Sequence, residues 1–213
     1  MKSKICLRSL TLAVIAIVSA SLPARGDVLY QSATLGPIGQ ASGYVLASYV
    51  FLGSRFSLSG PVQVDAIGGH MYGNYGTLFG AIFSLSGPNA LPSGSPFDST
   101  PLASVAFTPP VIGDTDVSVP LSVELQPGNY AILFGSGQFG ADGVGAMPDD
   151  NSDVPGQASY FGWWDNQWHN GGFNSVRFAV YGEPVPEPGI IALFAIGFGV
   201  IALRKFRHRR QLL

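Results

Sequence analysis

All three tryptophans of the chain lie within one segment of six residues, between positions 163 and 168. Asp165, Asn166 and Gln167 stand between them, and Asn170 follows two residues after the segment. Aromatic faces stack on sugar rings, while amide and carboxylate groups hydrogen-bond to sugar hydroxyls. The segment is therefore the best candidate for glycan binding, with these contact residues: Trp163, Trp164, Trp168 and His169. The alternative is a packing role, because adjacent strand positions point to opposite faces and one of the first two tryptophans should then face a core.

A second polar segment carries oxygen ligands of the kind that calcium prefers. Asp149, Asn151 and Asp153 alternate as the first ligands of an EF-hand loop do. However, Val154 stands where that loop needs glycine, and Tyr160 stands where it needs a bidentate glutamate. A solvated acidic loop is the favoured interpretation, and the sequence predicts no metal or other cofactor.

Motifs of enzyme chemistry are missing from the sequence. It has no Gly-x-Ser-x-Gly, no His-Glu-x-x-His and no glycine-rich phosphate loop followed by lysine. His70 is interpreted as a strand histidine with its own hydrogen-bond partners. The chain is therefore predicted to be non-catalytic. The alternative is a secreted glycan-active enzyme, either a glycoside hydrolase or a lyase. A hydrolase would use two carboxylates remote in sequence. Asp65 and Glu124 could form that pair, and nothing in the sequence favours them.

The C-terminal tail has three parts with different chemistry. Three prolines in residues 183–188 predict an extended, exposed segment that ends the folded domain. The next 15 residues, 189–203, are uncharged and would span about 22 Å as a helix, against a hydrocarbon core of about 30 Å. We expect a short transmembrane helix there, lengthened by the stems of flanking basic side chains. A basic tail over 204–213 would keep the C-terminus in the cytoplasm. Its cations are Arg204, Lys205, Arg207, Arg209 and Arg210. A buried helix of a soluble domain is the alternative, but such a helix is rarely apolar on all faces.

The order of these three parts resembles a known sorting signal. Val185, Pro186, Glu187 and Pro188, followed by the apolar helix and the arginine cluster, resemble the PEP-CTERM signal of bacterial surface proteins processed by exosortase. The resemblance covers residues 185–213. It implies recognition by a membrane-embedded exosortase, cleavage near Pro-Glu-Pro, and release into or attachment to extracellular polymer. The family often has a Ser/Thr-rich spacer before the motif, and here only residues 182–184 separate it from the last expected strand.

The N-terminus has the pattern of a secretory signal peptide over residues 1–26. Cations precede an apolar run from Leu10 to Val18, and Ala20, Ala24 and Gly26 offer cleavage points. We expect cleavage after Gly26 or Ala20, and transient contact with the general secretion machinery. A retained N-terminal anchor is the alternative. The single cysteine, Cys6, lies in this segment, so the mature protein should have neither a disulfide nor a cysteine site.

Charge is divided unevenly along the chain. Between the signal peptide and the basic tail, Arg55 and Arg177 are the only cations, against all thirteen acidic residues, so the formal charge there is about −11. Such a surface does not neutralise phosphates, which excludes nucleic-acid binding. It suits solubility outside the cell and binding of divalent cations or neutral glycans.

The sequence pattern of residues 27–182 is that of one all-β ectodomain. Short runs rich in Val, Ile, Phe and Tyr alternate with Gly, Pro, Ser and Asn clusters. Nine strands are expected, near residues 44–52, 54–58, 62–72, 77–85, 102–107, 117–124, 128–134, 158–164 and 176–181. They predict a single two-layer β-sandwich of jelly-roll or lectin-like shape, although an immunoglobulin-like sandwich has the same periodicity. In residues 117–125 the odd positions should face the core, and Pro120 on the other face indicates an edge strand.

The ectodomain also resembles the choice-of-anchor class of bacterial surface domains. The resemblance rests on residues 66–70, 78–82 and 127–137, which are mostly turns and core strands, and it implies a fold rather than an activity. Together these patterns predict an exported protein that is first an inner-membrane precursor and then reaches the cell surface or extracellular matrix. Its ectodomain is expected to be structural or to interact with polysaccharide.

Overall fold

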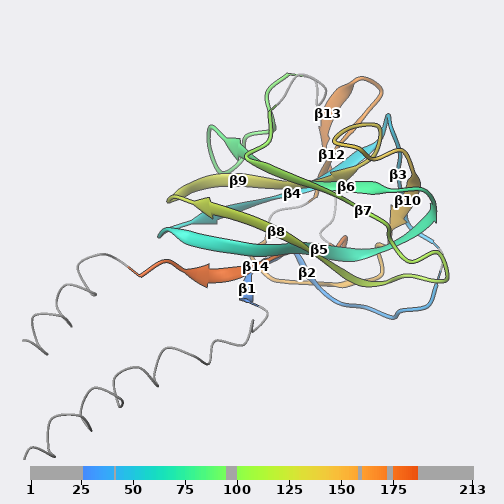
Figure 1. Ribbon diagram of the computed structural model, residues 1–213, viewed down its shortest axis with the longest axis horizontal. Helices are drawn as coiled ribbons and strands as arrows, with labels where there is room; N and C mark the ends of the chain where they lie inside the picture. The colour runs from blue at the N-terminus through green and yellow to red at the C-terminus, as the bar shows by residue number, and fades with distance from the viewer. Residues whose placement is uncertain (1–25, 41, 95–99, 158–159, 172–174, 187–213) are drawn as a thin grey trace, which may run out of the picture.

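The computed structural model describes residues 26–40, 42–94, 100–157, 160–171 and 175–186 (Figure 1). Within these ranges every regular element is a strand and none is a helix. The prediction of an all-β fold is therefore confirmed. The strands form two six-stranded sheets and one two-stranded sheet.

The first six-stranded sheet is organised around one long strand. Its order is β1 (Asp27–Gln31), β14 (Phe178–Pro184), β5 (Val62–Tyr75), β10 (Val144–Met147) and β3 (Tyr44–Leu46), and β8 (Thr115–Leu125) also pairs with β5. All of these pairs are antiparallel. The 14 residues of β5 thus bind β14 on one side and β8 on the other, and then continue to β10.

The second six-stranded sheet contains the hairpin that carries the tryptophans. Its order is β13 (Gln167–Asn170), β12 (Phe161–Trp164), β4 (Phe51–Leu58), β9 (Gly128–Gly135), β6 (Leu78–Leu85) and β7 (Ala103–Phe107). A small sheet of β2 (Ala33–Thr34) and β11 (Ser152–Asp153) completes the fold.

The alternation expected in residues 117–125 is present in β8. Val119, Leu121 and Leu125 are buried, whereas Ser122 is exposed. Pro120 is exposed as well, and β5 is the one strand paired with β8 among the described residues. The prediction of an edge strand is confirmed, because a proline without an N–H group costs no ladder hydrogen bond on an outer strand.

Side chains from both six-stranded sheets meet in one hydrophobic cluster. The rings of Phe134 on β9 and Phe178 on β14 stack with centroids 6.0 Å apart. Ile67 and Ile132 are fully buried in the same cluster. Full burial of one such side chain stabilises a fold by roughly 1.5–3 kcal/mol, so this interior is the main source of cohesion between the sheets. The jelly-roll or lectin-like description of the fold stays a prediction.

A second hydrophobic cluster covers the other face of the tryptophan-bearing sheet. Phe51, Phe79 and Phe161 are fully buried there, and Leu91 and Phe139 from loops pack against them. Gly135 on β9 is required at this place, because a Cβ atom would collide with the Phe51 ring. Both faces of this sheet are therefore packed, which the sequence pattern did not indicate.

The end of the folded domain differs from the prediction. The strand β14 continues through Pro184, which pairs with Val62, and the N–H of Val185 donates to the carbonyl oxygen of Pro61 at 3.0 Å. The domain thus extends beyond the predicted boundary at residue 182, and residues 183–184 belong to the sheet. The reason is the length of β5, which offers partners as far as its first residue, while Pro184 at the end of β14 needs no donor.

Both ends of the folded domain lie at the same sheet edge. Asp27 at the start of β1 pairs with Gly182 on β14 (Figure 1). Of the expected signal peptide only Gly26 is described, and the expected transmembrane helix (189–203) and basic tail (204–213) lie outside the described residues. Among described residues, no helix reaches the length and apolar character needed to cross a membrane.

Candidate functional site

The tryptophans are held on a two-stranded hairpin, β12–β13. Trp163 pairs with Trp168 and Trp164 with Gln167. The two residues of the turn, Asp165 and Asn166, have φ angles of 53° and 59°. A two-residue hairpin turn of type I′ has positive φ at both positions, and aspartate and asparagine tolerate it better than most other non-glycine residues. The predicted candidates are therefore brought together at one edge of the sheet.

Trp163 and Trp168 face the outer hydrophobic cluster. Their ring centroids are 5.3 Å apart with an interplanar angle of 72°, and Trp163 is 8% exposed. Trp168 contacts the Phe161 ring at 5.6 Å and donates its indole N–H to the carbonyl oxygen of Gly94 at 2.8 Å. These two rings thus have a structural role, and only the half-buried Trp168 retains surface exposed to solvent.

Trp164 projects to the opposite face and stacks on His169. Their ring centroids are 4.4 Å apart and their planes differ by 6°. The Nε2 atom of His169 also lies 3.2 Å from the Trp164 carbonyl oxygen, which fixes the imidazole in place. Both side chains are half-buried, and Trp164 also packs against the interior between the sheets. The structure thus places an aromatic pair near the hairpin turn, and contact with sugar stays a prediction.

The expected calcium loop is divided between surface and interior. Asp149 and Asp153 are exposed, whereas Asn151 is buried, so the expectation of a solvated loop is wrong at Asn151. Its amide accepts from the N–H of Gly36 at 3.0 Å and donates to the carbonyl oxygen of Ser175 at 2.8 Å. These bonds connect three loops and use both the oxygen and the nitrogen of the Asn151 side-chain amide. Among the described residues no group of three or more His, Cys, Asp or Glu could hold a metal ion.

His70 on β5 lies in a buried polar cluster that the sequence did not reveal. Its Nε2 atom is 3.1 Å from Asp114 Oδ1, and its Nδ1 atom is 2.9 Å from Asn151 Oδ1. His70 is fully buried and Asp114 nearly so. The interpretation of His70 as a strand histidine is confirmed by its place in β5. Its partners come from distant loops, and no local spacing could have identified them.

Arg177 joins four segments at the edge of the first sheet. Its guanidinium donates to both carboxylate oxygens of Asp116 at 2.9 and 3.1 Å, to Gln31 Oε1 at 2.8 Å and to the carbonyl oxygen of Ala33 at 2.7 Å. Burial works to lower the pKa of Arg177, but the hydrogen bonds and charge of Asp116 raise it above its ordinary value. Arg177 is therefore a structural cation with a carboxylate partner.

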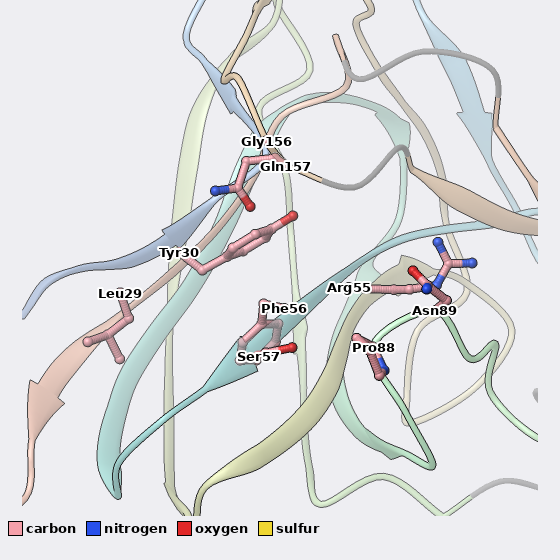
Figure 2. Close-up of a pocket in the computed structure, with 9 residues that line it drawn as sticks. All are labelled: Leu29, Tyr30, Arg55, Phe56, Ser57, Pro88, Asn89, Gly156 and Gln157. Carbon is pink, nitrogen blue, oxygen red and sulfur yellow. The ribbon is translucent and has the colours of Figure 1, made fainter.

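The other ectodomain cation, Arg55, lines a pocket of about 500 Å³ (Figure 2). Figure 2 shows Arg55 and Asn89 on one side of this pocket and Tyr30 and Gln157 on the other. The Tyr30 hydroxyl is 2.6 Å from Ser54 Oγ, and burial raises the pKa of Tyr30 to about 12, so the phenol stays neutral at physiological pH. Sequence reasoning missed this pocket. The one available signal was the scarcity of cations in the ectodomain.

The last residue of β14 and the segment after it match a known sorting motif. Residues 184–210 match the PEP-CTERM protein-sorting motif. The chain carries an exosortase sorting signal. This motif confirms the predicted resemblance of the tail and implies an exported protein that is processed by exosortase and sorted to the cell surface. The match begins at Pro184, the last residue of β14, so the sorting motif follows the folded domain without a spacer.

The match covers the tail and does not extend to the body of the protein. No curated protein matches the chain. The choice-of-anchor resemblance of the ectodomain therefore stays a prediction, and the role of the body has to be argued from its geometry.

Proposed function

We propose that this chain is a cell-surface or extracellular-matrix protein whose β-sandwich body is a non-catalytic module that interacts with polysaccharide. The observation that carries the proposal is the position of the sorting motif, which starts at the last residue of the last strand. The motif directs the β-sandwich domain to the cell surface, and this domain is the part that remains outside the cell after processing.

The folded domain and the Pro-Glu-Pro motif are separated by very few residues, which determines how close to the domain exosortase would cleave. Within the described residues the last hydrogen bond along the chain is donated by Val185, and Glu187 is two residues further. At roughly 3.3 Å per extended residue, the motif lies within about 10 Å of the folded domain. In this proposal residues 189–203 span the inner membrane of the precursor, and exosortase cleaves near Pro186-Glu187-Pro188. The body is thus released or attached without a stalk.

The proposed contact with neutral polysaccharide uses the hairpin β12–β13. Trp164 and His169 form a flat stacked pair, and Trp168 holds the base of the hairpin through the Gly94 carbonyl. Asp165 and Asn166 at the turn are exposed and offer polar groups beside the aromatic rings. Flat aromatic surface next to amide and carboxylate groups is the pattern that binds sugar rings.

Replacing Trp164 by alanine is expected to weaken binding to neutral polysaccharide by about fivefold to tenfold, because one ring-stacking contact is worth roughly 1 kcal/mol. Trp168→Ala is expected to weaken binding indirectly, because Trp168 holds the base of the hairpin through the Gly94 carbonyl. Affinity electrophoresis in gels that contain the polysaccharide measures the change. Trp163→Phe is the matched control, since Trp163 is buried in the outer cluster and should not touch a ligand. If both alanine variants are folded and bind as the wild type does, the aromatic hairpin is not the contact surface.

A further inference from the structure

Arg55 is a buried cation whose partners among the described residues are all neutral. It lies on β4 and is 8% exposed. Its Nε–H donates to the carbonyl oxygen of Ala90 at 2.8 Å, its Nη2 donates to Asn170 Oδ1, and its guanidinium stacks over the Phe161 ring at 4.9 Å. In the described part of the chain, no carboxylate oxygen lies within 4.0 Å of it.

The contrast with Arg177 shows that this arrangement is unusual within the same domain. Arg177 is buried to a similar degree, at 6% exposed, and has both oxygens of Asp116 as partners. Burying a cation without an anion costs free energy, and desolvation lowers the pKa of Arg55 below its ordinary value. Of the eleven acidic residues that the structure describes, none pairs with this buried arginine.

The environment of Arg55 offers room and polar contacts for a ligand. The pocket of about 500 Å³ is within the usual range for small-ligand sites of roughly 300–1,000 Å³. Ser57 and Asn89 contribute a hydroxyl and an amide to its lining, while Phe56 and Pro88 contribute apolar surface (Figure 2). This mixture suits a ring that has hydroxyl groups on its edge and an apolar face.

We propose that this pocket binds the carboxylate of a uronic acid unit in an acidic polysaccharide, with Arg55 as the anion contact. Ala90 and Asn170 accept two of the five N–H donors of Arg55, which leaves those of Nη1 and the second one of Nη2 for a carboxylate at the end of the guanidinium. Such charge-assisted bonds are the strongest that a neutral pocket offers to an anion. The choice of a sugar rests on the proposed polysaccharide role, whereas the choice of an anion rests on Arg55 alone. The site differs in ligand and position from the aromatic surface of the hairpin β12–β13.

The acidic surface of the domain suppresses non-specific binding of anionic sugars, so their binding depends on the specific contact with Arg55. With a formal charge of about −11 outside the two terminal segments, the surface repels polyanions, so an anionic sugar has little non-specific attraction to it. At about 0.15 M salt this repulsion is screened beyond about 8 Å, and the short-range contact with Arg55 then decides binding.

The test uses the full chain in detergent micelles and two probes, trigalacturonate and its carboxyl-reduced trisaccharide. Isothermal titration calorimetry should show that trigalacturonate binds at least about tenfold more tightly than the reduced probe. Arg55→Gln should remove that preference, because a hydrogen bond to a charged group contributes about 1.5–3 kcal/mol. Asn89→Ala should weaken binding by a smaller factor, and Gln63→Ala, on the other sheet, should leave it unchanged.

A second readout avoids dependence on the folding of the Arg55 variant. In the wild type, trigalacturonate should shift the side-chain Nε–H NMR signal of Arg55 and leave that of Arg177 in place. Equal affinity for the two probes, or an unshifted Arg55 signal at saturation, overturns the uronate site. If the reduced trisaccharide binds as tightly as trigalacturonate does, and Trp168→Ala weakens the binding of both, the polysaccharide role stands without this site. If galacturonate monomer shifts Arg55 and trigalacturonate does not, a polymer ligand is excluded.

Discussion

Replacing Arg177 by methionine is expected to lower the free energy of unfolding by about 3 kcal/mol, which is a large share of the stability of a domain of this size. The substitution removes the bidentate bond to Asp116 and leaves the acceptors of Gln31 and Ala33 without their donor. Because these partners belong to β8, β1 and β2, the loss should loosen the edge where both ends of the domain meet. Urea denaturation followed by tryptophan fluorescence measures the change.

Arg55→Met is the matched control for this prediction. Arg55 is buried to a similar degree, but its bonds go to neutral groups, so its removal also removes the cost of burying an unpaired charge. We expect a change within about 1 kcal/mol. An equal loss in both variants would show that Arg55 is a structural residue, and a small loss for Arg177→Met would show that its ion pair contributes little.

Replacing Glu187 by alanine is expected to abolish processing of the tail while export continues. Glu187 is the one charged residue of the Pro-Glu-Pro motif, and it lies within the segment that matches the sorting motif. An unprocessed precursor would retain residues 189–213 and should accumulate in the membrane fraction, where immunoblotting detects it at full length.

Glu183→Ala is the control for Glu187→Ala. Glu183 is an exposed glutamate four residues upstream, on β14, and lies outside the matched segment. It should be processed as the wild type is. Normal processing of Glu187→Ala would remove the motif from the sorting step, and a failure of both variants would point to a general effect on the end of β14.

The parts of the structure that were predicted are those with local signals. The alternation of Val119, Pro120 and Leu121 was sufficient to identify β8, its buried face and its position at an edge. The tail motif is likewise a local pattern, and residues 184–210 match it. Patterns of this kind require no knowledge of which strands meet in space.

Other elements were missed because their signals are weak or shared with loops. The strands β1 and β10 are short, and β13 follows a turn, Asp165-Asn166, that has no glycine. The expected strand over 44–52 is divided by a bridge between Ala47 and Val50, so it forms β3 and the start of β4. Short amphipathic runs do not distinguish these cases.

The candidate sites show the same limit. The sequence identified the tryptophans, but their division between the outer cluster and the His169 stack depends on strand pairing. The cluster of His70 and Asp114, and the neutral partners of Arg55, join residues that are far apart in the chain. The sequence shows that Arg55 is one of only two cations in the ectodomain. Only the fold shows that no described carboxylate lies within ion-pair distance of it.

We conclude that this protein is exported and then sorted through its C-terminal motif. The most direct test is intact-mass analysis of the protein recovered separately from the extracellular fraction and the membranes of its native host. We expect an extracellular form that begins near Asp27 and ends near Pro188. A protein found only in membranes, with residues 189–213 still attached, would show that the tail is an ordinary anchor and that exosortase does not sort this protein.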